Sequence, residues 1–84
     1  MEKCYITFRS VTFAQRGERI LEKAGIRAVL QRTPRWMEEQ GCGYCLRLPQ
    51  RNVQKAAQLL RSSGVPLRRA YCPDAQGELG EMVL

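Results

Sequence analysis

The chain has 84 residues, of which 44% are hydrophobic and 26% charged, and this composition is typical of one small folded domain and not of a disordered segment. It contains no histidine, which excludes His-based catalytic triads and His-containing metal sites. The net charge of +6 comes mainly from arginines that are scattered along the chain without an aromatic ladder, so it favours a solvated basic surface over a specific nucleic-acid site.

The cellular compartment is predicted from the absence of a membrane-spanning segment and of a signal-peptide pattern. No apolar run approaches the roughly 18 residues that a membrane span needs, and the first residues carry no signal-peptide pattern. We therefore expect a cytoplasmic protein without a membrane partner. The cysteines, at positions 4, 42, 45 and 72, are then expected to be thiols and not a disulfide framework.

The first half of the chain predicts a strand, a helix, a strand and a long connection. Residues 3–8 alternate as in a half-buried strand, and residues 10–12 offer an N-cap for a helix that ends at Gly25. Residues 26–32 indicate a second strand. The connection over residues 33–43 is long for a compact domain, which favours a functional role for it.

The second half repeats this plan. Residues 44–48 alternate as a third strand, and an apolar stripe predicts a second helix that begins after Pro49 and ends at Gly64. Residues 65–71 indicate a fourth strand, which Pro66 and an arginine pair place at an edge of the sheet. We expect one domain over residues 1–72 and a C-terminal tail over 73–84 that is either loose or a short added element.

The order of these elements predicts an α+β, ferredoxin-like βαββαβ fold. Right-handed crossovers favour a four-stranded antiparallel sheet of order 4-1-3-2 with two helices on one face. In this arrangement the end of the first strand lies beside the beginning of the third, where the first helix also begins. The loop that carries Cys42 should therefore arrive close to Ser10, Val11 and Thr12.

This placement makes Cys42 the candidate reactive residue. Helix N-termini present unpaired N–H groups and a partial positive charge, which stabilise a thiolate. Gly41 and Gly43 leave the sulfur uncrowded, and Arg35 adds positive charge from the same connection. Cys42 is accordingly predicted to be a nucleophile or a sulfur acceptor, with Ser10, Val11, Thr12, Arg35, Gly41 and Gly43 as the groups that stabilise its anion.

The other cysteines have less specific interpretations. Cys45 alternates onto the sheet face that the helices leave open, where it either resolves a modified Cys42 or fills space. Cys4 and Cys72 fall on neighbouring strands at the opposite end of the sheet, where an approach of the two to one another stays open. A zinc ion shared by all four cysteines is therefore disfavoured, and packing is the expected role of both. We expect no metal and no cofactor. Trp36 and Met37 are expected on an exposed loop, as a lid over Cys42 or as a docking anchor.

Several segments of the chain resemble the selenium/sulfur carrier-like protein family, a family of small bacterial domains of unknown function. The resemblance covers about residues 4–72, and its most specific parts are the Thr33-Pro34-Arg35 turn and the later Cys42-Gly43 pair. Further matching segments are residues 5–10, 22–26, 59–60 and 64–65. The chain differs from the family at Gly41, where members often have serine, and at Cys45, which is not part of the motif.

The resemblance implies a carrier that accepts a sulfur or selenium atom on Cys42. The expected partners are a protein donor such as a cysteine desulfurase and an unknown acceptor, and a homodimer stays open. Because no residue supplies a general base or a substrate pocket, a carrier is favoured over an enzyme. Two alternatives stay open: a non-catalytic interaction or regulatory module, and after it a basic nucleic-acid-binding domain.

Overall fold

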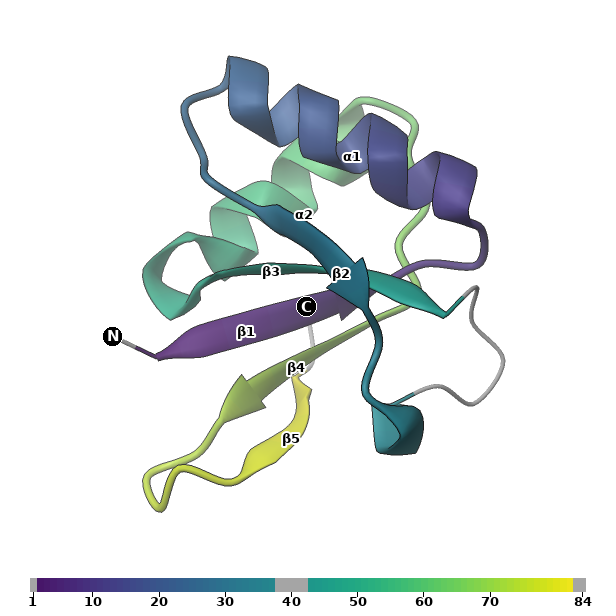
Figure 1. Cartoon of the computed structure of the whole chain (residues 1–84). Coiled ribbons are helices and arrows are strands. Elements are labelled where there is room, and N and C mark those ends of the chain that lie inside the picture. Colours follow the sequence, from purple (N-terminus) through teal and green to yellow (C-terminus); the bar gives the residue numbers. More distant parts are fainter. Residues whose placement is uncertain (1, 38–42, 83–84) are drawn as a thin grey trace.

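Strand β1 (Lys3–Thr7) lies in the middle of an antiparallel sheet and pairs with β3 on one side and β4 on the other. The computed structural model describes residues 2–37 and 43–82. Within them the sheet has the order β2-β3-β1-β4-β5 (Figure 1). The remaining strands are β2 (Val29–Arg32), β3 (Tyr44–Pro49), β4 (Arg69–Pro73) and β5 (Leu79–Met82).

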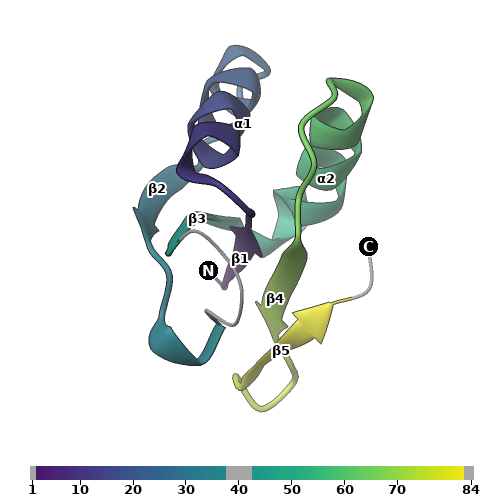
Figure 2. The same ribbon diagram turned by 90° about the vertical axis from the view of Figure 1, so that its right-hand side faces the viewer.

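Two helices, α1 (Val11–Lys23) and α2 (Val53–Ser62), lie on the same side of this sheet (Figure 2). A short 3₁₀ helix, η2 (Gln50–Asn52), leads from β3 into α2, and a second one, η1 (Arg35–Met37), follows β2. Figure 2 shows η1 on the side of the sheet away from α1 and α2. The α+β class with two helices is thus confirmed.

The predicted count of four strands is wrong, because the described residues form five; the order differs from the prediction by the added β5 beyond β4, while the predicted neighbours 4-1-3-2 are kept. The added strand β5 returns along β4 through a tight turn that Asp74 organises. Its carboxylate oxygen Oδ1 accepts hydrogen bonds from the backbone N–H groups of Gln76 (2.9 Å) and Glu78 (3.0 Å). Gly77 closes the turn in the left-handed region with φ of 83°, which glycine adopts without steric cost.

Strand β4 also differs from the prediction, since it begins at Arg69 and lies between β1 and β5 instead of at an edge. Val65 is completely buried but precedes the strand, and Pro66 has no N–H to donate. The Arg68 N–H, which donates to the Thr7 carbonyl oxygen over 2.8 Å, connects this segment to β1.

The hydrophobic core lies between the sheet and the helices. Ile6 and Phe8 from β1 and its extension pack there with Leu46 from β3 and Leu60 from α2. Helix α1 approaches this layer closely because Gly17 has no side chain: a Cβ at that position would lie 3.2 Å from Leu60 and 3.4 Å from both Leu46 and Phe8. Burial of these apolar side chains is the main favourable contribution to folding.

The expectation that Cys4 and Cys72 are separate thiols is wrong, because a disulfide joins them. The antiparallel register places Tyr5 opposite Tyr71, which brings Cys4 opposite Cys72 on the neighbouring strand. The two Cα atoms are 4.4 Å apart, within the range that a disulfide spans. The predicted strand order places Cys4 and Cys72 on neighbouring strands, so their approach was foreseeable, whereas the expected reducing compartment wrongly favoured two thiols.

Candidate functional site

The end of the sheet at which β1 finishes is the candidate functional site. Thr7, the last residue of β1, lies opposite Cys45 of β3 and opposite Arg69 of β4. The predicted juxtaposition of the end of the first strand and the beginning of the third is therefore present. Cys42 and Gly41 lie outside the described residues, so their predicted approach to α1 stays a prediction.

Helix α1 begins at this same end with the predicted cap. Ser10 is extended (φ −141°, ψ 153°), and its Oγ accepts a hydrogen bond from the Phe13 N–H over 3.2 Å. The first turn carries no acidic side chain that would offset the helix dipole. Because Val11 and Thr12 occupy the first helical positions, their N–H groups have no intrahelical acceptor. Ser10, Val11 and Thr12 therefore form an electropositive helix start.

Gly43 and Thr33 join the two ends of the connection between β2 and β3. The Thr33 N–H donates to the Gly43 carbonyl oxygen over 2.9 Å, and Gly43 has a φ of 83°. A residue with a side chain would be strained in this conformation. Next to this bond, the guanidinium of Arg32 lies 5.4 Å from the ring centre of Tyr44, its partner across the strands.

The segment η1 crosses the sheet face that the helices leave open. Trp36 follows the edge strand β2, yet its ring packs edge-to-face against Tyr71 of β4, with 5.3 Å between the ring centres. In the strand order, β3 and β1 lie between these two residues. Arg35 therefore lies on the opposite side of the sheet from α1, and the structure does not bring it together with Ser10–Thr12 (Figure 2).

Cys45 is buried on this open face. It lies opposite Thr7 and Gln31 in the two neighbouring strands, and its exposed fraction is 0% although no helix covers it. Met37 in η1 is 1% exposed, so the prediction of an exposed loop is wrong for Met37. The two buried side chains indicate that the crossing of η1 gives the open face a thin second layer.

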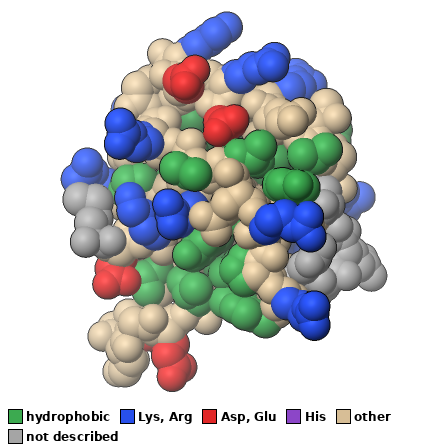
Figure 3. Space-filling view, viewed as in Figure 1, with side chains coloured by type: hydrophobic (Ala, Val, Ile, Leu, Met, Phe, Trp, Pro, Cys, Tyr) green, Lys and Arg blue, Asp and Glu red, His purple; other side chains and the backbone are tan. Residues whose placement is uncertain are grey.

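Trp36 is exposed as predicted, at 54% of its surface, and Val29 at 40% is the other large exposed hydrophobic side chain among the described residues. Figure 3 shows hydrophobic side chains gathered below the helices, with Lys and Arg side chains on both sides of them. The surface next to η1 is therefore apolar with a basic surround.

Arg68 is a potentially functional residue that the sequence analysis did not single out. Its Nη1 is buried and has no hydrogen-bond partner in the described structure, and its backbone N–H is bonded to Thr7. The adjacent Arg69 is different, since its guanidinium lies 3.4 Å from the Glu81 carboxylate. Neighbouring residues of an extended chain point to opposite faces, so two adjacent arginines are expected to differ in surroundings, but the sequence does not tell which of them is buried.

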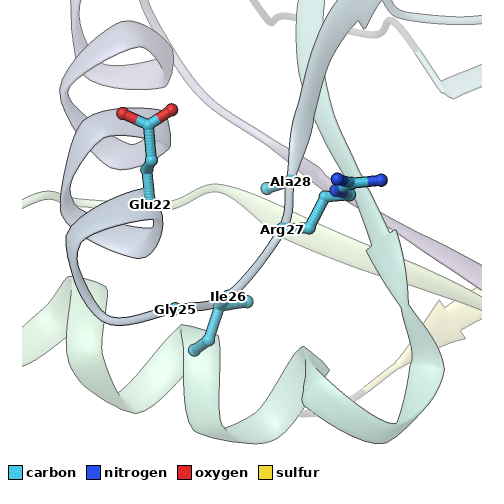
Figure 4. A pocket seen from close by; sticks show the side chains of 5 residues that line it. All are labelled: Glu22, Gly25, Ile26, Arg27 and Ala28. Atoms are coloured by element: carbon cyan, nitrogen blue, oxygen red, sulfur yellow. The ribbon is translucent and has the colours of Figure 1, made fainter.

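The pocket shown in Figure 4 lies elsewhere, at the C-terminal end of α1. It has a volume of about 300 Å³ and is lined by Glu22, Gly25, Ile26, Arg27 and Ala28. Figure 4 shows the Glu22 and Arg27 side chains pointing in different directions, so this pocket offers no convergent pair of charged groups. It contains no nucleophilic side chain, and we assign it no function.

Two further searches were confined to the described ranges. No cluster of three or more Cys, Asp or Glu side chains suitable for a metal ion was found in residues 2–37 and 43–82. Across the same ranges, no helix has the length and apolar character that crossing a bilayer requires.

Comparison with known proteins gave one match. The model of a family described as "Putative Se/S carrier protein-like" matches residues 3–72, which run from the first residue of β1 to the last but one of β4 and leave out β5. Searches of curated proteins and of solved structures gave no match.

Proposed function

Since the chain belongs to this Se/S carrier protein-like family, we propose that it carries a sulfur or selenium atom on Cys42 and relays it between proteins. The donor is a protein persulfide or selenosulfide, such as that of a cysteine desulfurase, and the acceptor is a second protein. A carrier needs one reactive sulfur and access for two partners, and it needs no substrate pocket.

The transfer step is a thiol exchange. The Cys42 thiolate attacks the outer sulfur of the donor persulfide, a new sulfur–sulfur bond forms on Cys42, and the donor cysteine leaves as a thiolate. The transferred atom and its proton then reside on Cys42 as a persulfide. A selenosulfide donor reacts in the same manner, with selenium as the transferred atom.

The observation that carries this proposal is the register that sets Thr7 opposite Cys45. It brings the start of β3, two residues after Cys42, next to the end of β1, and β1 leads directly to the capped N-terminus of α1. The N–H groups of Val11 and Thr12 are suited to stabilising a persulfide anion. The buried Nη1 of Arg68 is an additional cationic donor on the segment bonded to Thr7.

Cys45 has a second role in this scheme. When the Cys45 thiolate attacks the inner sulfur of a Cys42 persulfide, a Cys42–Cys45 disulfide forms and hydrosulfide leaves. Cys45 is fully buried, so this side reaction is suppressed while Cys45 stays covered. We propose that Cys45 is a guarded resolving thiol.

Sulfur loading tests the proposal. The protein is incubated with a bacterial cysteine desulfurase and cysteine labelled with radioactive sulfur, and label that reductant releases is counted. We expect the label on the wild type and on a Cys72→Ser variant, and its loss from Cys42→Ser. Label that persists on Cys42→Ser at the wild-type level would overturn Cys42 as the acceptor, and its absence from all three proteins would overturn the carrier function with this donor.

A further inference from the structure

The Cys4–Cys72 disulfide is a second sulfur centre, separate from the proposed carrier site. Cys4 is the second residue of β1 and lies opposite Leu48, whereas Cys45 lies opposite the last residue of β1. The disulfide therefore lies near the beginning of β1, whereas the start of β3 lies beside the end of β1. Whatever happens at Cys42, the reactivity of this disulfide follows from its own surroundings.

Its two sulfur-bearing residues differ in exposure. Cys4 is 0% exposed and belongs to the core cluster, whereas Cys72 is partly exposed and lies at the margin of that cluster. Thiol–disulfide exchange requires the attacking thiolate to reach the sulfur that it attacks. An external thiolate can therefore attack Cys72, and Cys4 is protected.

The β5 strand leaves an approach to Cys72 open. Gly80 lies directly opposite Cys72, and a Cβ built on Gly80 meets no other heavy atom within 4 Å. Side chains of directly opposed residues lie on the same face of a sheet, so the missing side chain of Gly80 leaves space beside the Cys72 sulfur. On the other side, Met82 Sδ lies 3.4 Å from Cys72 Sγ. An external thiolate can thus reach the Cys72 sulfur over Gly80, and Met82 borders this path.

From this asymmetry we propose that Cys72 is a thiol-exchange site through which low-molecular-weight thiols of the glutathione class open the Cys4–Cys72 disulfide, and through which the disulfides of those thiols close it in the reverse reaction. The thiolate attacks Cys72 Sγ, a mixed disulfide forms there, and the bond to Cys4 breaks. Its electron pair stays on the Cys4 sulfur, which takes up a proton. A second thiolate attacks the sulfur of the bound thiol, releases the Cys72 thiolate and completes the oxidation of two external thiols to one disulfide.

The consequence is a redox-dependent clamp. The disulfide joins two central strands across a sequence separation of 68 residues, so its closure removes much of the freedom of the unfolded chain. Its reduction leaves Cys72 as a partly exposed thiol that can be modified by the same class of molecule. This inference does not depend on the carrier function.

Reduction of the oxidised protein by glutathione tests the site. Samples are quenched with acid, alkylated and digested with trypsin, which separates Cys4 (residues 4–9) from Cys72 (residues 70–84). We expect the glutathione adduct on residues 70–84 to exceed that on 4–9 at least about tenfold, because only Cys72 is accessible. Equal adducts, an excess on 4–9, or failure to find the two peptides joined before reduction would each overturn the proposal.

A Gly80→Val variant provides the test when the adduct is too short-lived to accumulate. A side chain opposite Cys72 blocks the proposed approach, so the rate of disulfide reduction should fall at least about fivefold. The matched control is Gln76→Val, which adds the same side chain on the exposed turn of the same hairpin and should leave the rate unchanged. An unchanged rate in Gly80→Val, or equal rates in the two variants, would show that the attack follows another route.

Discussion

The two faces of the sheet are both buried, but in different ways. On one face, α1 and α2 cover Ile6 and Leu46, and the disulfide lies at the edge of that core. On the other face, Cys45 and Met37 are equally inaccessible, and within residues 2–37 and 43–82 the helical segment on this face is the short η1. The crossing is held by the edge-to-face contact of Trp36 with Tyr71 and by the Thr33–Gly43 hydrogen bond.

Side chains that are equally buried on the two faces are therefore not equally protected from exposure by local opening. The helix-covered face is part of the cooperative core and opens only when the domain unfolds. The face under η1 depends on few contacts, so it can open locally at a lower free energy. Under the proposed carrier function, we expect this difference to let Cys45 become accessible while the sheet stays intact.

The largest effect is expected from the disulfide. A Cys72→Ala variant should lose about 4 kcal/mol of unfolding free energy relative to the oxidised wild type, because a cross-link over 68 residues restricts the unfolded chain. Urea unfolding of the variant and of the oxidised and reduced wild type measures this. The reduced wild type should resemble the variant, and an oxidised protein no more stable than the variant would contradict the clamp.

A pair of truncations, matched in burial, compares the faces directly. Leu46→Ala should cost about 3 kcal/mol, as expected for a leucine in a packed core. Met37→Ala should cost only about 1 kcal/mol, because η1 can separate from the sheet without unfolding it. Both side chains are at most 1% exposed in the native protein. Equal losses in urea unfolding would show that the open face belongs to the cooperative core.

The cap of α1 makes a smaller contribution. Ser10→Ala removes the acceptor for the Phe13 N–H and should lower the unfolding free energy by about 1 kcal/mol. Ser63→Ala, at the C-terminal end of α2, is the control and should change the unfolding free energy by less than about 0.5 kcal/mol. In the loading experiment, Ser10→Ala should retain label on Cys42, since backbone N–H groups and not the hydroxyl are proposed to stabilise the anion.

The smallest effect on global stability is expected at Trp36. Trp36→Ala removes one aromatic contact and should cost about 0.5 kcal/mol. Alkylation of Cys45 by iodoacetamide under native conditions should accelerate about twofold, because the contact is absent from the locally opened state and its loss lowers the free energy of opening by the same amount. Arg35→Ala, a change at the neighbouring exposed position of η1, is the control. Alkylation that is unchanged in Trp36→Ala would mean that η1 does not guard Cys45.

The sequence predicted those elements whose signals are local. Alternation in residues 3–8 and 44–48 identified β1 and β3, and the serine before Val11 identified the start of α1. The strand β5 was not resolved from a loose tail because Gly80 interrupts its short alternation. The start of β4 was placed too early because Val65 and Leu67 are apolar, although they belong to the connection that precedes the strand.

The candidate site was only partly predictable, because its main features depend on contacts between distant residues. The burial of Met37 and Cys45 and the contact of Trp36 with Tyr71 involve residues that are far apart in the sequence, and no local pattern predicts them. The disulfide could have been predicted from the proposed strand order, which makes the strands of Cys4 and Cys72 neighbours. It was not predicted because a cytoplasmic location was expected, where cysteines are usually thiols. The orphan Nη1 of Arg68 depends on packing geometry, which a pair of arginines in a sequence does not specify.

The Cys4–Cys72 bond also turns most of the polypeptide into a covalent ring. A single proteolytic cut after Arg27, or anywhere else between the two cysteines, leaves both fragments attached, so they migrate together on a gel until a reductant is added. A cut in the turn at residues 74–77 instead releases β5 as a free peptide. The ring and its appendage can thus be told apart by electrophoresis alone.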